Sequence, residues 1–211
     1  MCLTPDRAVW WPGGADGGAL LIADTHWGKS ETLRRMGAGV PGGVLTEQLG
    51  RLGGLIARFG AQRVVVVGDL LHAGIGITPS LVDRVGEWVA ATGVVLEVVP
   101  GNHDRAIERV VEPWNLVMRD AVHREGAFAF VHDPADAGAV DAYAWCGHVH
   151  PGVRLAGGGD AVRVPCYVMG ERVGVLPAFS SFTGRGGGRG GGRVGDDAAV
   201  FAIAGDRVVQ V

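Results

Sequence analysis

The stretch Ala23-Asp24-Thr25-His26-Trp27-Gly28-Lys29-Ser30 follows directly on an apolar run that begins at Ala19, and it allows two interpretations. Written as A-x-x-x-x-G-K-S after a strand, it is close to a phosphate-binding P-loop, with Ala23 in place of the first glycine. Written as D-x-H, it is the first half of a metal site in which Asp24 and His26 are ligands. The choice between them decides the function, so the rest of the sequence has to support one or the other.

Two further apolar runs, Arg63 to Val67 and Val94 to Val99, are typical of strands that are covered on both faces. The segment between Leu45 and Phe59 has apolar residues at spacings of three and four, which predicts a helix with one apolar face. Thr78-Pro79 is a plausible N-cap and first position of another helix. Strands that alternate with helices in this way predict a largely parallel sheet.

From about Trp114 the sequence consists of short β-like segments, among them Leu116 to Met118, Ala127 to His132 and Ala142 to Cys146. We expect this half to form hairpins in a second sheet. The predicted fold class is therefore α/β, with two sheets packed together in one domain that spans residues 1–211. Residues 184–195 contain almost only glycine and arginine, which predicts a flexible loop.

The composition limits the classes of protein that the chain can belong to. Its formal net charge is −3 and Lys29 is its only lysine, which argues against a basic nucleic-acid coat. No apolar run approaches the length of a membrane span. The three cysteines lack CxxC spacing and the chain does not open like a secretory signal, so we expect a cytoplasmic protein. Cys146 lies beside two histidines but is expected to be a small buried apolar residue.

Polar side chains follow each of the predicted parallel strands at the point where the strand ends, and the same holds for two strands of the second half. Carboxyl ends of strands in an open α/β sheet converge on one crevice, and carboxylates, amides and imidazoles are metal-ligand types. These side chains therefore predict a shared metal site. They are Asp24 and His26, Asp69 and His72, Asn102, His103 and Asp104, His132, and the pair His148 and His150.

Taken singly, a histidine or aspartate at a strand end is more often a turn residue than a ligand, and His72 and Asp104 are the most easily explained in that way. Taken together, the residues indicate more, because six of the seven histidines lie in or beside these strand ends. Only His123 lies elsewhere. Chance placement would seldom produce this distribution.

The P-loop interpretation has one supporting feature, since Arg63 to Asp69 resembles an apolar strand that ends in a magnesium-binding aspartate. However, a phosphate cradle needs small residues so that the backbone can approach the anion, and Asp24 would place a carboxylate against the phosphates. This interpretation also leaves the other histidines without a role. It predicts tight ATP binding that Lys29→Ala abolishes, and we expect a metal site instead.

The chain resembles the calcineurin-like metallophosphoesterase superfamily in an ordered set of motifs. The set comprises Asp24-Thr25-His26, Gly68-Asp69, Gly101-Asn102-His103-Asp104, His132 and Gly147-His148-Val149-His150. Further stretches are similar to the bacterial ligase-associated DNA damage response endonucleases. They are Thr25 to Lys29, Arg34 to Gly37, Leu70 to Ala73, Gly174 to Phe179 and Ser181 to Gly184. The Arg-Gly segment after Gly184 departs from that family.

The resemblance implies a four-layer α/β/β/α sandwich of two mixed β-sheets flanked by helices, with two divalent metals between the loops. By position, one metal would be held by Asp24, His26 and His150, the other by Asn102, His132 and His148, with Asp69 bridging them. Two cations about 3.5–4 Å apart lower the pKa of a bridging water towards 7, so a bridging hydroxide would be the nucleophile. His103, positioned by Asp104, would protonate the leaving oxygen.

Ligands of this kind without thiolate suit Mn²⁺, Fe, Co or Ni and do not exclude Zn²⁺. The resemblance favours manganese. Four further side chains are candidates for contacts with substrate phosphates, and they are Lys29, Arg34, Arg35 and His72.

The predicted function is a binuclear-metal-dependent phosphodiesterase, acting as a DNA endonuclease in DNA repair, with DNA ligase and helicase repair proteins as implied partners. The alternative within the superfamily is a small-molecule phosphoesterase or pyrophosphohydrolase with a nucleotide or lipid-linked substrate. The alternative of a different class is a non-catalytic scaffold, because some proteins of this fold are binding modules. Those typically lack the catalytic histidine, whereas His103 is present here.

Overall fold

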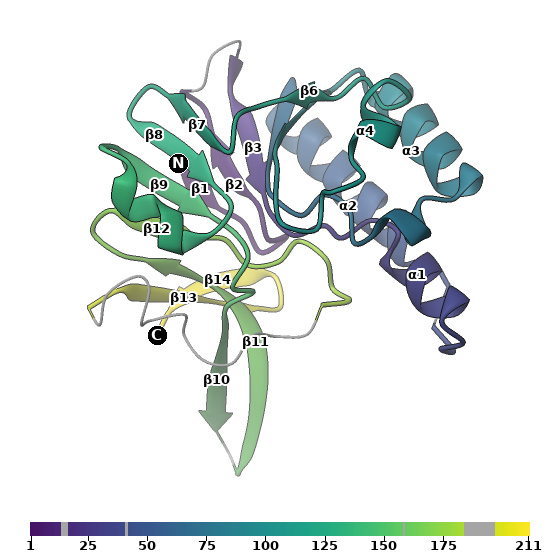
Figure 1. The fold of residues 1–211 in the computed structure, drawn as a ribbon. Helices are drawn as coiled ribbons and strands as arrows, with labels where there is room; N and C mark the ends of the chain where they lie inside the picture. The colour runs from purple at the N-terminus through teal and green to yellow at the C-terminus, as the bar shows by residue number, and fades with distance from the viewer. Residues whose placement is uncertain (14–16, 41, 158, 184–196) are drawn as a thin grey trace.

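A computed structural model describes residues 1–13, 17–40, 42–157, 159–183 and 197–211. In these residues two β-sheets pack face to face, and α-helices cover the outer face of the first sheet (Figure 1). Both sheets are mixed, as the sequence predicts. The Gly/Arg segment 184–195, for which a flexible loop is predicted, lies outside the described residues.

The first sheet has the strand order β1-β2-β3-β4-β5-β6 in the described part of the chain. Its strands are β1 (Cys2–Leu3), β2 (Val9–Trp11), β3 (Ala19–Ile22), β4 (Arg63–Val67), β5 (Val95–Val99) and β6 (Val117–Met118). Strands β3 to β6 are parallel, which confirms the prediction from the strand–helix alternation. The expectation that Leu116 to Met118 belongs to the second sheet is wrong. After β5 the chain returns through α4 (Glu108–Val111), which brings β6 alongside β5.

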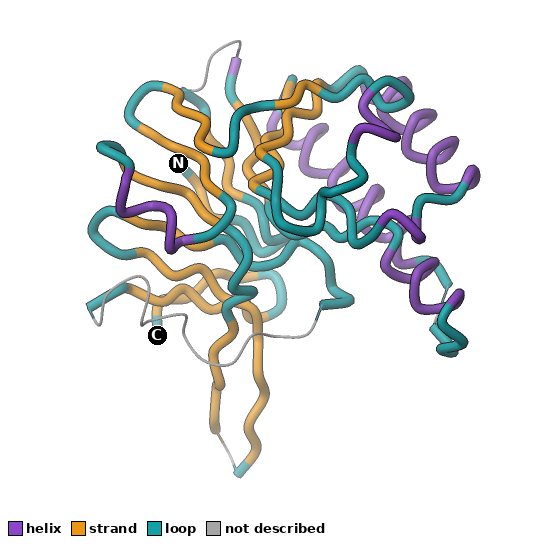
Figure 2. Tube along the Cα trace, in the orientation of Figure 1, coloured by secondary structure: helices purple, strands orange, loops and turns teal. Residues whose placement is uncertain are grey.

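Except for the 3-10 helix η3 (Pro134–Ala139), which lies against the second sheet, the helices gather on one side of the molecule (Figure 2). Besides α4 they are α1 (Lys29–Arg35), α2 (Val44–Phe59), α3 (Pro79–Thr92) and the short 3-10 helix η2 (Gly74–Gly76). Helix α3 begins as predicted, because Thr78 Oγ1 accepts a hydrogen bond from the Leu81 N–H at 3.2 Å and Pro79 is the first residue. It ends at Gly93, whose φ of 65° is in the left-handed region that glycine adopts without strain.

The second sheet has the order β14-β13-β11-β12-β9-β8-β7, with β10 paired to β11. Its strands are β7 (Val122–Glu125), β8 (Phe128–Val131), β9 (Tyr143–Cys146), β10 (Gly152–Gly157), β11 (Asp160–Met169), β12 (Val173–Val175), β13 (Ala199–Ala204) and β14 (Arg207–Gln210). Hairpins are only part of this sheet, since β9 is parallel to both β8 and β12. The 3-10 helix η3 (Pro134–Ala139) makes the crossover from β8 to β9 and packs against both. The expected four-layer sandwich has helices on the second sheet as well. Among the described residues, η3 is the helix that packs on this sheet.

The central strands of the first sheet are largely apolar because both of their faces are covered. In β3, Leu20 and Ile22 pack under the helices, whereas Leu21 packs in the layer between the sheets. Residues of the second sheet such as Phe130 and Trp145 complete this layer. This layer holds the two sheets together and so fixes the relative positions of their strand ends.

An ionic network joins the two sheets at the amino ends of the parallel strands. Buried Arg63 lies 2.9 Å from Glu97 of β5 and 2.5 Å from Glu125 of β7, and Arg119 lies 2.9 Å from Glu97. Two arginines and two glutamates balance their charges, which a buried network requires. Removal of one partner from such a network leaves an uncompensated buried charge.

Three glycines interrupt α2, and Gly50 and Gly54 face open space, since a Cβ at either position would have no neighbour within 4 Å. Glycine costs a helix interior about 1 kcal/mol relative to alanine. We therefore expect Gly50→Ala and Gly54→Ala each to raise the free energy of unfolding by about 0.5–1 kcal/mol, measured by urea denaturation. Gly76→Ala is the control with the opposite expected effect. It should lower the free energy of unfolding, because its Cβ would collide with the Gly28 carbonyl oxygen. A loss of stability in the α2 variants would contradict the prediction.

All three cysteines are free thiols, as expected. Cys146 is fully buried, and burial raises the pKa of its thiol to about 12, so it is an inert apolar residue. No helix in the described part of the chain is long and apolar enough to cross a membrane.

Candidate metal centre

The polar residues singled out in the sequence lie in loops at the carboxyl ends of β3, β4, β5, β8 and β9. Backbone hydrogen bonds tie the first two loops together: the Asp24 N–H donates to the Gly68 carbonyl and the His26 N–H to the Asp69 carbonyl, each at 3.0 Å. The loops after β8 and β9 are joined by the Gly147 N–H, which donates to the His132 carbonyl at 3.0 Å. The fold therefore brings all of these strand ends to one place.

Five of the seven candidate ligands have left-handed backbone conformations. Their φ angles are 55° for Asp24, 47° for His26, 53° for Asp69, 68° for His148 and 48° for His150. Among the described non-glycine residues, this conformation is shared only by Arg7 and Asn115. Such residues cost free energy and persist where the surroundings hold them, often at functional sites. The backbone is thus bent at each position so that the side chains converge.

Asp24, His26 and His150 form a first group whose ligand atoms lie within 4.8 Å of one another. His26 Nε2 lies 3.3 Å from His150 Nε2, and His150 Nε2 lies 3.4 Å from Asp24 Oδ1. The Asp24 carboxylate is held in place by the His148 N–H, which donates to Oδ2 at 3.0 Å. Asp24 and His26 are buried, whereas the His150 side chain is 19% exposed at the mouth of the site.

A second group consists of Asp69, His132 and His148, with Asn102 beside it. His132 Nε2 lies 3.0 Å from Asn102 Oδ1, 3.1 Å from His148 Nδ1 and 3.5 Å from Asp69 Oδ2. The same Asp69 oxygen lies 4.0 Å from His26 Nε2 of the first group. Asp69 therefore stands between the two groups, as expected of a carboxylate shared by two ions.

The electrostatics of the two groups follow from burial and from Asp69. Burial lowers the pKa of His26 to about 3 against the opposing charge of Asp69, so His26 offers a lone pair at neutral pH. Burial also opposes protonation of His132, but the hydrogen bond and charge of Asp69 outweigh it and raise the His132 pKa. In turn His132 lowers the pKa of Asp69, although burial acts in the opposite direction.

The donor set fits divalent cations. His132 Nε2 faces an amide oxygen, a carboxylate oxygen and a second imidazole nitrogen, and it carries at most one proton to share among them. Acceptor atoms that converge in this way repel one another unless a cation lies among them. Oxygen and imidazole ligands without thiolate match the preferences of first-row divalent ions such as Mn²⁺.

His103 belongs to neither of these two groups, although ring nitrogens of His103, His26 and His72 also lie within 4.8 Å of one another. Its ring is T-shaped to His26 at a centroid distance of 5.1 Å and stacks on His72 at 5.3 Å. His103 Nδ1 lies 2.8 Å from the His72 carbonyl oxygen, to which an Nδ1–H donates. The backbone N–H of His103 donates to Asp69 Oδ1 at 2.9 Å. These two contacts fix the orientation of the ring.

The structure does not place Asp104 against the ring of His103, so the expected positioning contact needs correction. The Asp104 carboxylate accepts hydrogen bonds from the backbone N–H groups of Leu70, Leu71 and Gly101 at 3.3, 2.8 and 2.9 Å. A buried carboxylate satisfies three N–H donors in this way and joins the loop after β4 to the loop after β5. Its role is to hold the loops, and the His72 carbonyl orients His103.

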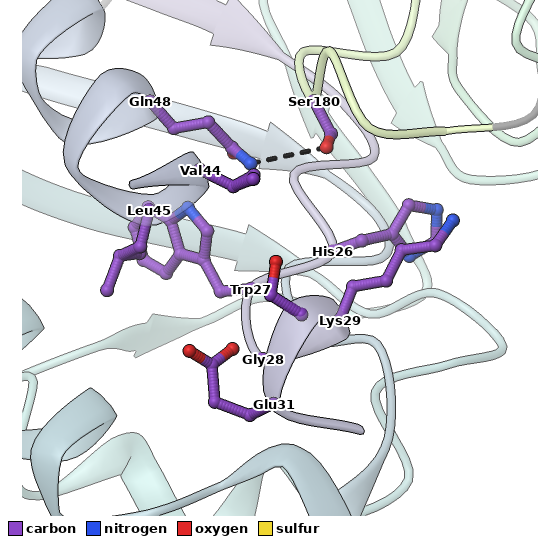
Figure 3. Close-up of a pocket in the computed structure, with 10 residues that line it drawn as sticks. His26, Trp27, Gly28, Lys29, Glu31, Val44, Leu45, Gln48 and Ser180 are labelled. Carbon is purple, nitrogen blue, oxygen red and sulfur yellow. Dashed lines mark hydrogen bonds between the residues drawn. The ribbon is translucent and has the colours of Figure 1, made fainter. Parts of the chain in front are cut away.

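Lys29 and His72, for which substrate contacts are predicted, lie beside His26. Figure 3 shows the Lys29 side chain alongside His26 in a small pocket that Gln48 and Ser180 also line, with Gln48 Nε2 donating a hydrogen bond to Ser180 Oγ. Burial lowers the pKa of Lys29, and its ammonium lies 5.8 Å from the centre of the Phe182 ring. Burial likewise lowers the pKa of His72.

Arg34 and Arg35 are not brought to the metal centre. Both are exposed in the last turn of α1, which points away from the body of the molecule (Figure 1). They lie five and six positions after Lys29 in the helix, which corresponds to about 8–9 Å along its axis. Arg34 lies 3.5 Å from Glu31. Any contact they make with a substrate is therefore remote from the reacting atoms.

The glycines that precede three ligand residues have a structural reason that the sequence alone did not reveal. A Cβ at Gly68 would collide with the His132 ring, and one at Gly101 would collide with Asp69. A Cβ at Gly147 would lie 2.7 Å from the Ala23 Cβ. Each glycine lets two strand ends approach, and the motifs Gly-Asp, Gly-Asn and Gly-His were the available signal.

The sequence assigned no functional role to Arg7 or Ser180, although the stretches on either side of Ser180 are part of the family resemblance. Arg7, in the left-handed conformation, donates to the carbonyl oxygens of Ala178 and Ser180 at 3.4 and 2.7 Å and lines a cavity together with His150. The Phe179 N–H donates to the Ala23 carbonyl at 2.7 Å, which brings this segment to the Asp24 loop. Residues more than 150 positions apart meet here, and no local pattern marks them.

Two mixed sheets flanked by helices, with seven ligand-type side chains at their strand ends, give the chain a metallophosphoesterase-like fold. Among solved structures it is similar to Pseudomonas putida nuclease MPE, with a TM-score of 0.80 and 29% identity over 99% of this chain and 93% of that one. A predicted phosphoesterase from Streptococcus pneumoniae TIGR4 overlaps at 15% identity over 88% of this chain and 82% of that one, and its TM-score of 0.34 is too low to establish a shared fold. No family model and no curated protein matches the sequence.

Proposed function

We propose that the protein is a metal-dependent phosphodiesterase that cleaves DNA as an endonuclease in DNA repair. The observation that carries the proposal is the pair of ligand groups joined by Asp69, with His103 next to them. The similarity of almost the whole chain to a nuclease supports a polynucleotide substrate. In this proposal Asp24, His26 and His150 hold one ion, Asn102, His132 and His148 hold the other, and Asp69 contacts both.

When bound, the two ions supply a water of lowered pKa and stabilise charge at phosphorus. Side chains of the protein transfer the proton and bind the phosphate. His103 donates its Nδ1–H to the His72 carbonyl and presents Nε2, from which a proton passes to the leaving oxygen. Lys29 binds a non-bridging phosphate oxygen, because its ammonium lies next to His26 and His72 and no carboxylate contributes to its pKa shift.

The surroundings of the metal centre favour an extended substrate. One cavity opens beside His150 and is lined by Arg7 and Pro165, and another opens on the other ligand group beside Asn102, His132 and His148. Both cavities adjoin the metal centre, so a polymer that lies across it can contact the chain on both sides of the scissile bond. A substrate consisting of a single small phosphate needs only one of them.

The test is a substrate panel with the purified protein and Mn²⁺. We expect nicking of supercoiled plasmid and hydrolysis of bis(p-nitrophenyl) phosphate, both abolished by EDTA and restored by added metal. Parallel reactions with Mg²⁺, Fe²⁺, Co²⁺, Ni²⁺ and Zn²⁺ identify the preferred ion. No DNA cleavage together with rapid hydrolysis of a nucleotide, a phosphomonoester or a lipid-linked pyrophosphate would overturn the DNA assignment. An inactive protein that binds no metal would favour the scaffold alternative.

DNA ligase and helicase repair proteins are proposed as partners on the family resemblance. Co-purification from cells exposed to a DNA-damaging agent tests this. If neither protein is recovered with the tagged chain, the proposal of these partners is contradicted. The catalytic proposal is not affected by that result.

A further inference from the structure

The hairpin formed by β10 and β11 projects from the second sheet into solvent (Figure 1). It begins directly after the metal-centre loop, since only Pro151 separates His150 from the first residue of β10. Its base is tied by the Cys166 N–H, which donates to the Pro151 carbonyl at 3.2 Å. The hairpin is therefore an arm that starts at the mouth of the proposed active site.

The two faces of this arm differ in chemistry. Directly opposite residues of an antiparallel pair point to the same face, so Val153 and Val164 share one face with the pair Leu155 and Val162. At the base this apolar face packs on the core of the second sheet. The other face therefore points away from that core.

Arginines mark that other face. Arg154 stands opposite Arg163, and Gly152 stands opposite Pro165 on the same face. Pro165 lines the cavity beside His150, so this face of the arm continues from the metal centre outwards. The Arg163 side chain extends towards the base, because a Cβ at Gly152 would lie 3.0 Å from Arg163 Nε. We call these residues the arginine face.

Arg154 is exposed, and no ion pair involving it is present in the described part of the chain. Arginine matches phosphate geometry better than any other side chain. Two guanidinium groups on one face of the arm therefore suit a polyanion.

We propose that the arginine face of the β10–β11 hairpin binds polynucleotide phosphates that flank the scissile phosphodiester. This inference rests on the proposed function and adds the path of the substrate to it. Arg154 lies four residues beyond His150, about 13 Å along an extended strand. At 3.4 Å of rise per nucleotide in a DNA strand, this corresponds to about four nucleotides from the scissile bond. A two-stranded ribbon also has the width that a DNA groove admits.

The experiment compares the Mn²⁺-loaded full chain with its R154Q/R163Q variant on two substrates, a duplex oligonucleotide and bis(p-nitrophenyl) phosphate. We expect kcat/KM on DNA to fall on the order of 10-fold near physiological salt, because two phosphate contacts are lost. The slope of log kcat/KM against log salt should become shallower by about 2, since each contact contributes about 0.9. Hydrolysis of the small diester should not change.

Arg172→Gln is the matched control, because Arg172 is an exposed arginine directly before β12 and lies 3.3 Å from Asp141. Its kinetics on both substrates should match those of the wild type. A Tm of R154Q/R163Q equal to that of the wild type shows that the hairpin is intact. Unchanged DNA kinetics and an unchanged salt slope overturn the inference. Equal losses on both substrates also overturn it, because they place the arginines in the metal centre.

A failure of the proposed function would give a different result from a failure of this inference. In that case the wild-type protein hydrolyses the small diester and does not cleave DNA, and the inference falls with it. A single-stranded oligonucleotide of the same sequence distinguishes a contact with the cleaved strand from one with its complement. On duplexes that end fewer than about four nucleotides from the scissile bond, R154Q/R163Q should cleave as fast as the wild type. This result would place the arginine contact at about that distance from the scissile bond.

Discussion

Asp69→Ala is expected to lower hydrolysis of both DNA and bis(p-nitrophenyl) phosphate by at least about 10³-fold. Asp69 Oδ2 lies 3.5 Å from His132 Nε2 and 4.0 Å from His26 Nε2, so one substitution weakens both proposed ion sites. Stabilisation of charge by a bound metal is worth several kcal/mol, and about 1.4 kcal/mol changes a rate tenfold. Steady-state kinetics and elemental analysis of bound metal on the same preparation check the prediction.

Two variants separate this effect from simple unfolding. Asp69→Asn keeps an oxygen that accepts from the His103 N–H, but it removes the negative charge, so we expect an intermediate loss of metal and activity. Asp83→Asn changes an exposed carboxylate on α3 and should behave like the wild type. Full activity of Asp69→Ala with two bound ions per chain would refute the bridging role.

His103→Ala is expected to lower DNA cleavage by about 10²–10⁴-fold, which is the usual contribution of a general acid. Metal content should stay at the wild-type level, because His103 belongs to neither of the two ligand groups joined by Asp69. The loss should be much smaller on bis(p-nitrophenyl) phosphate, since p-nitrophenolate leaves without protonation. A residue with a merely structural role would affect both substrates equally.

His123→Gln is the histidine control, because His123 lies in β7 and its Nε2 is 3.8 Å from Glu125, within the ionic network between the sheets. Its activity on both substrates should match that of the wild type. Added imidazole should restore part of the DNA cleavage by His103→Ala. Equal losses on both substrates, or a loss of metal in His103→Ala, would show that His103 acts as a ligand or a structural residue.

The first half of the fold was largely predictable because its signals are local. The β-branched run from Arg63 to Val67 indicates a strand covered on both faces, and Thr78-Pro79 marks a helix start by hydrogen-bond chemistry within one turn. The second half was less predictable. Parallel pairing of β8 with β9 depends on the crossover through η3, and the place of β6 depends on the return through α4.

The candidate site shows the same division. The order of the ligand types along the chain indicates their convergence, because strand polarity brings carboxyl ends together. The contact between His103 and the His72 carbonyl and the three N–H groups around Asp104 could not be anticipated. Which residue orients the His103 ring depends on the geometry of the loops, which local sequence patterns do not determine.

In the stretch around Asp24, the sequence by itself determined the residue types: a carboxylate and an imidazole after a buried strand, followed by Gly-Lys-Ser that imitates a P-loop. The later motifs of the sequence already favour the metal site over the P-loop, and the tertiary structure shows how its ligand types come together. Asp24 and His26 turn through left-handed backbone towards His148 and His150, and α1 contains only the residues Lys29–Arg35. The physical reason is that side-chain periodicity and hydrogen-bond chemistry act over a few residues, whereas a metal site is built by the packing of distant strand ends.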